Sequence, residues 1–208
     1  MVNRVRLRFN KQGDLRLTSH RDLMRTVERL FRRAGVALCE SEGFHPKPRV
    51  HYPASLALGM TGLDEVLEAD LADDSIQPGD LLVRLNGHSV PGLEFTAAEC
   101  LTIQGKKGQP RVLQFEVSLP NDRAAEIGDK VADFLAATMW ISQRDKKPVD
   151  IRRLVEELSI VDGQLTMRLR VVNEAGARPR DVLEALGLSV DETLELDITR
   201  THVEMAPS

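Results

Sequence analysis

Hydrophobic and polar residues alternate along residues 4–9, where each arginine is followed by an apolar side chain. A period of two is typical of a strand with one buried face. The spacing of the apolar residues then changes to that of a helix. We expect this helix to begin at Thr18 or Ser19 and to end at Gly35. Ser19 and Asp22 have approximately the spacing of a capping box, which supports this start. The chain therefore predicts a strand followed by an amphipathic helix.

The rest of the first half continues in the same two periods. Glycine and proline in residues 43–49 require a loop. Beyond it we expect extended segments at 50–58 and 66–71, a short helix at 78–85 and a strand at 93–103. Residues 104–110 are polar and contain glycine and proline, which is typical of a linker or a long hairpin.

The second half repeats this order. We expect strands at 112–117, 149–161, 165–172 and 194–203, a helix at 121–138 capped by Asn121 or Asp122, and a short helix at 179–186. Residues 161–163 have the composition of a hairpin turn. The fold class predicted from this repeat is α+β, with two tandem ferredoxin-like β-α-β-β-α-β units and antiparallel sheets. The expected domains are 1–104 and 111–206.

Composition excludes several classes of protein. Of the 208 residues, 42% are hydrophobic, which argues against a disordered chain. No apolar run is long enough to cross a membrane, and the N-terminus lacks the apolar core of a secretory signal, so we expect a cytoplasmic protein. The two cysteines, Cys39 and Cys100, are too few for a four-cysteine zinc site or an iron–sulfur cluster. They are expected to be buried, reduced thiols, and no cofactor is expected.

The formal net charge of −4 conceals an uneven distribution. Residues 1–52 hold 12 Lys and Arg against 5 Asp and Glu, a balance of +7, and three of the five histidines. Residues 53–208 hold 16 basic and 27 acidic residues, a balance of −11. A basic first quarter favours an anionic partner, although chance alone can divide charge unevenly.

The start of the first helix is one candidate binding site, because free backbone N–H groups and the helix dipole favour an anion there. His20 could act as a phosphate ligand or a general base, or it could be a structural histidine packed under the first turn. The arginines that follow could bind a phosphate backbone, or they could face solvent while Glu28 pairs with Arg25 and Arg32.

The loop that carries His45, Lys47, Arg49 and His51 is the second candidate. Alternate residues of an extended backbone point the same way, so these four side chains could share one face. Gly43 permits close approach of the backbone, and prolines stiffen the loop, which suits a phosphate or another acidic ligand. The alternative is a stiff connector with solvated charges. A metal site from the two histidines would need a third ligand, which no residue at a suitable spacing supplies.

Arginines on the first strand are expected to be neutralised within the sheet. In a ferredoxin-like unit this strand is central, and the strand at 66–71 should pair with it antiparallel. Acidic side chains of that strand would then face the arginines across the open side of the sheet. The expected partners are Glu68 and Asp70 for Arg4, Arg6 and Arg8. The low aromatic content of 4% also argues against a sheet that stacks RNA bases.

Three motifs carry a resemblance to a known family. They are RFNKQGDLRLTSHRDLMR at 8–25, RRAG at 32–35 and SEGFHPKP at 41–48. They are similar to the pattern of the radical SAM-linked proteins, a bacterial family of uncharacterised function, with Leu17 where an aromatic residue is usual. The resemblance implies a small domain fused to, or encoded beside, a radical SAM enzyme. It also implies RNA as the distant substrate, because the family tends to neighbour ribosome-assembly and RNA-processing functions.

These observations define one set of candidate residues and three hypotheses. The candidate anion- or RNA-binding residues are Lys11, Ser19, His20, Arg21, Arg25, His45, Lys47, Arg49 and His51. The first hypothesis is a non-catalytic accessory domain that docks on a radical SAM enzyme and binds structured RNA or a ribosome-assembly intermediate. The second is a metal-independent endoribonuclease with His20 as its catalytic residue, since CRISPR repeat-processing enzymes share the predicted layout. The third is a protein-only adaptor whose acidic half binds a basic partner.

Overall fold

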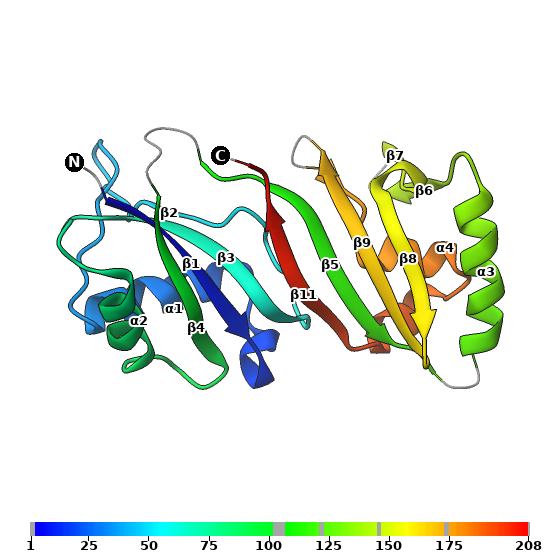
Figure 1. The fold of residues 1–208 in the computed structure, drawn as a ribbon, viewed down its shortest axis with the longest axis horizontal. Coiled ribbons are helices and arrows are strands. Elements are labelled where there is room, and N and C mark those ends of the chain that lie inside the picture. Colours follow the sequence, from blue (N-terminus) through cyan, green and yellow to red (C-terminus); the bar gives the residue numbers. More distant parts are fainter. Residues whose placement is uncertain (1–2, 102–106, 121–122, 145–146, 173–174, 208) are drawn as a thin grey trace. The chain divides into compact units, whose positions relative to one another are not determined.

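The computed structural model describes residues 3–101, 107–120, 123–144, 147–172 and 175–207 (Figure 1). Contacts between residues divide the chain into two compact units. The first unit comprises Met1–Gln109 with Met205–Ser208, and the second comprises Pro110–Glu204. The fold is α+β, as the sequence predicted. Of the predicted linker, residues 104–106 lie outside the described ranges.

The first unit is built on an antiparallel sheet. Its elements are β1 (Asn3–Lys11), the 3-10 helix η1 (Gly13–Leu17), α1 (His20–Arg33), β2 (Val50–His51), β3 (Thr61–Leu71), α2 (Pro78–Asn86) and β4 (Leu93–Leu101). The strands lie in the order β2-β3-β1-β4, and each of these pairs is antiparallel. Because β2 has two residues, most of the predicted extended segment at 50–58 is not a strand.

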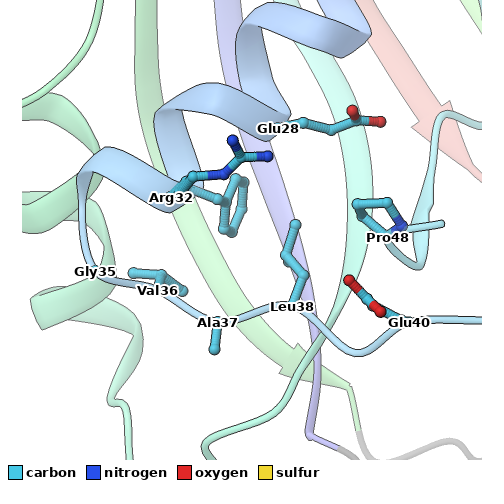
Figure 2. A pocket seen from close by; sticks show the side chains of 9 residues that line it. Glu28, Arg32, Gly35, Val36, Ala37, Leu38, Glu40 and Pro48 are labelled. Atoms are coloured by element: carbon cyan, nitrogen blue, oxygen red, sulfur yellow. The ribbon is translucent and has the colours of Figure 1, made fainter. Parts of the chain in front are cut away.

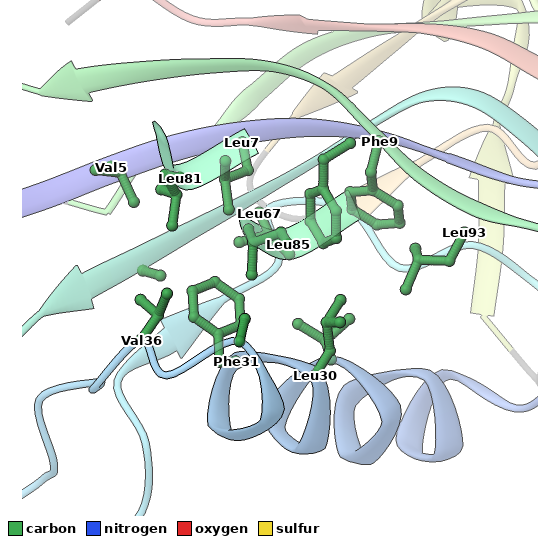
Figure 3. Packing of buried hydrophobic residues seen from close by; sticks show 14 of the residues in the cluster. Val5, Leu7, Phe9, Leu30, Phe31, Val36, Leu67, Leu81, Leu85 and Leu93 are labelled. Carbon is green, nitrogen blue, oxygen red and sulfur yellow. The ribbon is translucent and has the colours of Figure 1, made fainter. Parts of the chain in front are cut away.

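One face of this sheet carries the core of the unit (Figure 3). Val5, Leu7 and Phe9 of β1 point into it and are at most 1% exposed. Leucines of α1 and α2, together with Phe31, pack against them, so both helices cover the same face. Full burial of each such side chain stabilises the fold by about 1.5–3 kcal/mol. The arginines of β1 are left on the opposite face, which confirms the predicted period of two.

The helix α1 begins and ends where the sequence predicted. The Ser19 hydroxyl accepts a hydrogen bond from the Asp22 backbone N–H at 3.2 Å and donates one to the Asp22 carboxylate at 2.7 Å. Gly35 has a φ of +66°, a left-handed conformation that glycine adopts without strain and that ends the helix. Both ends of α1 are therefore set by local chemistry.

The second unit contains more elements than the sequence indicated. They are β5 (Pro110–Ser118), α3 (Ala124–Ala136), β6 (Ile141–Arg144), β7 (Lys147–Asp150), η2 (Arg152–Leu154), β8 (Val155–Val161), β9 (Gln164–Val172), β10 (Ala175–Gly176), α4 (Pro179–Ala185), α5 (Val190–Glu195) and β11 (Ile198–Met205). The main strands lie in the order β8-β9-β5-β11, with β9 antiparallel to both β5 and β8. Asp162 and Gly163, at φ 50° and 76°, form the predicted turn.

Several expectations for the second unit need correction. The β6–β7 hairpin and η2 take up the first part of the strand predicted at 149–161. The predicted strand at 194–203 begins too early, because α5 extends to Glu195 and β11 starts at Ile198. The predicted caps of α3, Asn121 and Asp122, lie outside the described residues. Taken over all strands the pairing is mixed, so antiparallel sheets throughout are not confirmed.

Candidate functional site

Residues 39–49, named the basic hairpin from here on, fold against β3. Within the hairpin, the backbone N–H of Arg49 donates to the Cys39 carbonyl at 2.8 Å. The backbone of Asp70 in β3 accepts a hydrogen bond from Cys39 at 2.7 Å and donates one to Arg49 at 3.0 Å. The two arms of the predicted loop are therefore fixed to the sheet by backbone hydrogen bonds.

The basic hairpin and β3 line a cavity of about 450 Å³. Its lining residues are Arg4, Ser41, Lys47, Pro48, Arg49, Val50, His51, Glu68, Asp70 and Lys107. The structure thus brings together three of the predicted ligand residues, Lys47, Arg49 and His51. His45 lies exposed at the hairpin tip and does not line the cavity. Lys107 joins the site although sequence reasoning assigned it only to a linker.

Both carboxylates in the cavity wall are already paired. Asp70 accepts two hydrogen bonds from the Arg4 guanidinium at 2.7 and 3.2 Å, and this contact raises the pKa of Arg4 above its ordinary value. Glu68 accepts hydrogen bonds from Arg6 and from the Gly108 backbone N–H, each at 2.9 Å. These contacts confirm the predicted cross-strand ion pairs of Arg4 and Arg6, which stand opposite Asp70 and Glu68 in the β1–β3 register. Arg8 stands opposite Val66 and contacts the Asp64 carboxylate of β3, a partner that the prediction did not name.

The cavity therefore contains cations that are not neutralised by its two carboxylates. Among the described residues, the side chains of Lys47, Arg49 and Lys107 make no ion pair. All three are exposed to solvent. Since the two carboxylates are held by Arg4 and Arg6, these three cations are available to an anion.

His51 lines the cavity and contacts Gly108, the residue that follows Lys107. The His51 Nε2 atom lies 3.0 Å from the Gly108 carbonyl oxygen, and a carbonyl can only accept, so this contact requires a proton on Nε2. A Cβ atom on residue 108 would overlap the Glu68 carboxylate. Glycine is therefore needed where the backbone approaches β3.

His20 packs edge to face on Tyr52, with their ring centroids 5.2 Å apart. The Tyr52 hydroxyl is buried and has no hydrogen-bond partner in the part of the chain that the structure describes. Burial, with a smaller effect from the negative charge of Glu28, raises the pKa of Tyr52 well above its ordinary value. Sequence reasoning found no partner for His20, because Tyr52 is distant in the chain and no motif marks it.

Lys11 and Ser19 are engaged in local structure. Lys11 is fully buried at the end of β1, where its ammonium donates to the carbonyls of Thr18 at 3.0 Å and Arg16 at 3.4 Å. Ser19 holds the Asp22 carboxylate at the start of α1. An acidic side chain thus already occupies the helix N-terminus that was predicted to bind an anion.

The arginine stripe of α1 lies apart from the cavity. Arg21 and Arg25 are exposed, and Arg25 lies 3.5 Å from the Asp22 carboxylate. Glu28 makes no ion pair among the described residues, so its predicted pairing with Arg25 and Arg32 is wrong. Glu28 and Arg32 instead line a second cavity of about 460 Å³, whose other walls are largely apolar (Figure 2).

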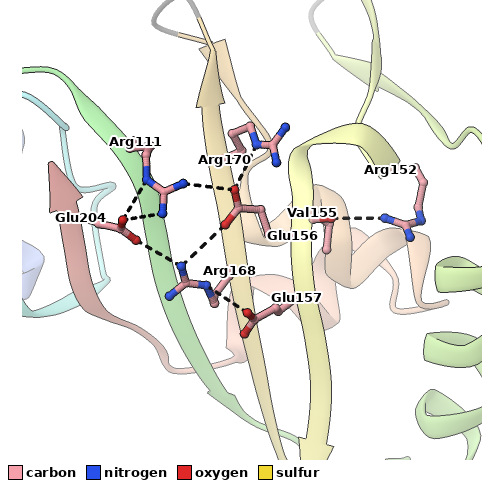
Figure 4. Close-up of polar contacts among 8 residues, drawn as sticks. All are labelled: Arg111, Arg152, Val155, Glu156, Glu157, Arg168, Arg170 and Glu204. Atoms are coloured by element: carbon pink, nitrogen blue, oxygen red, sulfur yellow. Dashed lines mark hydrogen bonds and ion pairs between the residues drawn. The ribbon is translucent and has the colours of Figure 1, made fainter. Parts of the chain in front are cut away.

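In the second unit, ion pairs connect the strands (Figure 4). The Glu204 carboxylate contacts Arg111 at 2.5 Å and Arg168 at 3.1 Å. The Glu156 carboxylate contacts Arg170 at 3.1 Å and Arg168 at 3.6 Å. These arginines are neutralised within their own unit.

The described residues contain no group of three or more His, Cys, Asp or Glu side chains that could hold a metal ion. None of the described helices is long and apolar enough to cross a membrane. Cys100 is exposed and Cys39 is partly exposed, so the expectation of buried thiols is wrong.

Comparisons with known proteins give one assignment. No curated protein matches the chain. Among solved structures, the crystal structure of an unknown protein from Galdieria sulphuraria aligns over 100% of both chains, with 12% identity and a TM-score of 0.30. Residues 4–180 match a family model described as "Uncharacterized protein conserved in bacteria (DUF2344)". Since this match includes the basic hairpin and most of both units, the chain belongs to the conserved bacterial family DUF2344.

Proposed function

We propose that this chain is a non-catalytic accessory domain that binds a phosphate-bearing substrate, such as structured RNA, at the basic hairpin. The observation that carries the proposal is the cavity beside β3, where Lys47, Arg49 and Lys107 make no ion pair among the described residues. Lysine and arginine side chains hold phosphate groups by charge-assisted hydrogen bonds. The arginines of β1 do not add to this site, because their charge is used within the sheet.

The size of the cavity limits what it can hold. Its volume of about 450 Å³ falls in the range of pockets for small ligands. Such a pocket suits one or two phosphates of a nucleotide unit rather than the whole backbone of a long duplex. We therefore propose a local contact with RNA.

We further propose that each unit is ferredoxin-like. The strand orders β2-β3-β1-β4 and β8-β9-β5-β11 support this, because the first and third main strands of each unit are central.

We also propose that the domain works in the cytoplasm with a radical SAM enzyme, on the strength of the motifs at 8–48. Affinity purification of the tagged chain from its native cells tests the partnership. Recovery of a radical SAM enzyme is expected, and its repeated absence after crosslinking contradicts the partnership.

RNA binding across a salt series tests the proposed site. We expect the double variant Lys47→Ala/Arg49→Ala to bind RNA on the order of tenfold more weakly. We also expect a smaller salt slope, which is the slope of the logarithm of the binding constant against the logarithm of the salt concentration. Its magnitude should fall by about 1.4, since each lost phosphate contact removes about 0.7. The matched control, Arg21→Ala/Arg25→Ala, removes the same charge from α1 and should change neither value. Equal losses in both variants would contradict the site. A wild-type protein that binds no RNA at any salt concentration would favour the protein-only adaptor.

A second function, a metal-independent endoribonuclease, is favoured by the contact between His20 and Tyr52. A histidine can act as the general base of such a reaction, and the Tyr52 ring would hold its imidazole in place. RNA incubated with the wild type, His20→Ala and Tyr52→Phe tests this role. Loss of cleavage in His20→Ala, with cleavage kept in Tyr52→Phe, would support it, and equal cleavage by all three proteins would eliminate it.

A further inference from the structure

Phe44 lies at the tip of the basic hairpin and is fully exposed to solvent. It is the most exposed of the large hydrophobic side chains in the part of the chain that the structure describes. An aromatic ring contributes a large apolar surface to an interface, and burying that surface is favourable. A ring that is fully exposed to water therefore marks a candidate binding surface.

The hairpin presents this ring on a fixed base. The backbone N–H of Ser41 donates to the Lys47 carbonyl at 2.8 Å, and the Lys47 N–H donates to the Ser41 hydroxyl at 3.0 Å. These bonds close a short tip at residues 42–46, and Pro46 restricts its backbone. Less conformational entropy is lost on binding when the ring is presented by such a closed turn.

The side chains around Phe44 are polar or charged. Glu42 and His45 are exposed at the same tip, and Lys47, which lines the cavity, follows three residues after the ring. The centre of a protein–protein interface is depleted of charged residues, so these neighbours argue against an anchor for a protein. An aromatic ring beside cations is instead typical of single-stranded nucleic acid binding, where a base stacks on the ring and phosphates meet the cations.

We infer that Phe44 stacks on an unpaired base of RNA whose phosphates are held by Lys47 and Arg49. This inference rests on the proposed function and narrows its substrate class to single-stranded or looped RNA. The bases of a duplex are already stacked on each other, and side chains cannot enter the deep major groove of A-form RNA. A duplex would therefore reach the cations of the cavity but not the ring.

Two RNA probes of equal length, one unpaired and one duplex, test the inference by fluorescence anisotropy. Phe44→Ala is expected to weaken binding of the unpaired probe by about 5- to 150-fold, since a stacked base contributes about 1–3 kcal/mol by alanine substitution. Its salt slope and its binding of the duplex should stay as in the wild type, because the cations are retained. Val83→Ala, which removes another exposed apolar side chain from α2, is the matched control and should bind as the wild type does.

Phe44→Trp adds a direct readout. The chain has one tryptophan, Trp140, which lies in the second unit, so the added indole supplies a separate signal. We expect unpaired RNA to quench it and Phe44→Trp to keep the wild-type affinity. If the wild type binds RNA with a steep salt slope but Phe44→Ala binds equally well, the inference fails while the proposed function stands. If Phe44→Ala reduces only the recovery of a protein partner, Phe44 is a protein anchor and the inference is also overturned.

Discussion

The two units both neutralise arginines across their sheets, but they bury these ion pairs to different depths. In the first unit, the Glu68 side chain is 1% exposed and its partner Arg6 is 12% exposed. In the second unit, Arg111 and Arg170 are 45% and 51% exposed where they meet Glu204 and Glu156. A similar pattern of charges along the strands therefore gives a buried ion pair in one unit and a solvated network in the other.

This difference shows that the arginines of the first sheet are not available to a ligand. This sheet holds the densest run of arginines, yet those arginines are bonded to carboxylates. In the cavity beside β3, the cations left for a ligand sit on the basic hairpin and at Lys107. A count of basic residues thus overstates the charge that a ligand can meet.

Removing one arginine from each unit should give the largest difference between the units in the loss of unfolding free energy. Arg6→Ala leaves the buried Glu68 carboxylate without its guanidinium partner, so we expect a loss of about 3 kcal/mol in the free energy of unfolding. Arg170→Ala breaks an exposed pair and should cost about 0–1 kcal/mol. Urea unfolding followed by far-UV circular dichroism measures both. The double variant Arg6→Met/Glu68→Met should recover most of the loss, and equal effects of the two single variants would contradict the difference in burial.

Replacing one glycine by alanine in each unit should change the free energy of unfolding in opposite directions. Gly108→Ala places a Cβ atom against the Glu68 carboxylate, so we expect a loss of about 1–3 kcal/mol in the free energy of unfolding. Gly128→Ala lies within α3, and its Cβ would meet no atom within 4 Å in the described structure. There alanine should stabilise the fold by about 0.5–1 kcal/mol, because it is the better helix former. Thermal unfolding measures both changes, and a Gly108→Ala variant as stable as the wild type would refute the close approach.

The features that sequence could predict are those fixed by near neighbours. The period of two in β1, the Ser19 cap and the Gly35 end of α1 each depend on residues within a few positions. The β1–β3 ion pairs also follow, because the period sets the face and the fold class sets the neighbouring strand. Lys47, Arg49 and His51 were expected to lie together for the same reason, since alternation places them on one side, whereas His45, predicted with them, does not line the cavity.

The features that sequence missed depend on segments that meet only after folding. Tyr52 contacts His20, and Lys107 joins the cavity, from positions far along the chain that no local pattern connects. The predicted pairing of Glu28 failed because spacing along a helix permits an ion pair without requiring one. Phe44 was passed over because an apolar residue in a loop carries no periodic signal of its exposure.

The smallest expected effect concerns two carboxylates, one in each unit: Asp73 is exposed and Glu204 is partly exposed. The hydrogen bond from Arg111 lowers the pKa of Glu204 below its ordinary value, with further effects from the charge of Arg111 and from Arg168. In the first unit, the hydroxyl and backbone N–H of Ser75 lower the pKa of Asp73. A carboxyl group whose pKa is lower in the folded state stabilises the fold fully above its ordinary pKa. That contribution is lost as the pH falls through the folded value.

Glu204→Gln and Asp73→Asn should therefore each lower the free energy of unfolding at neutral pH, and the difference from the wild type should shrink between about pH 6 and pH 3. High salt should distinguish them. It should shrink the effect of Glu204→Gln, because that carboxylate is held by partly exposed charges that salt screens. It should change the effect of Asp73→Asn less, because the hydrogen bonds from neutral Ser75 are the larger causes there and the charge of Arg84 is a smaller one. Urea unfolding in about 0.1 M and about 1 M NaCl measures the contrast, with far-UV circular dichroism reporting both units and Trp140 fluorescence reporting the second. Equal salt sensitivity of the two variants would show that the Glu204 network does not act through charge.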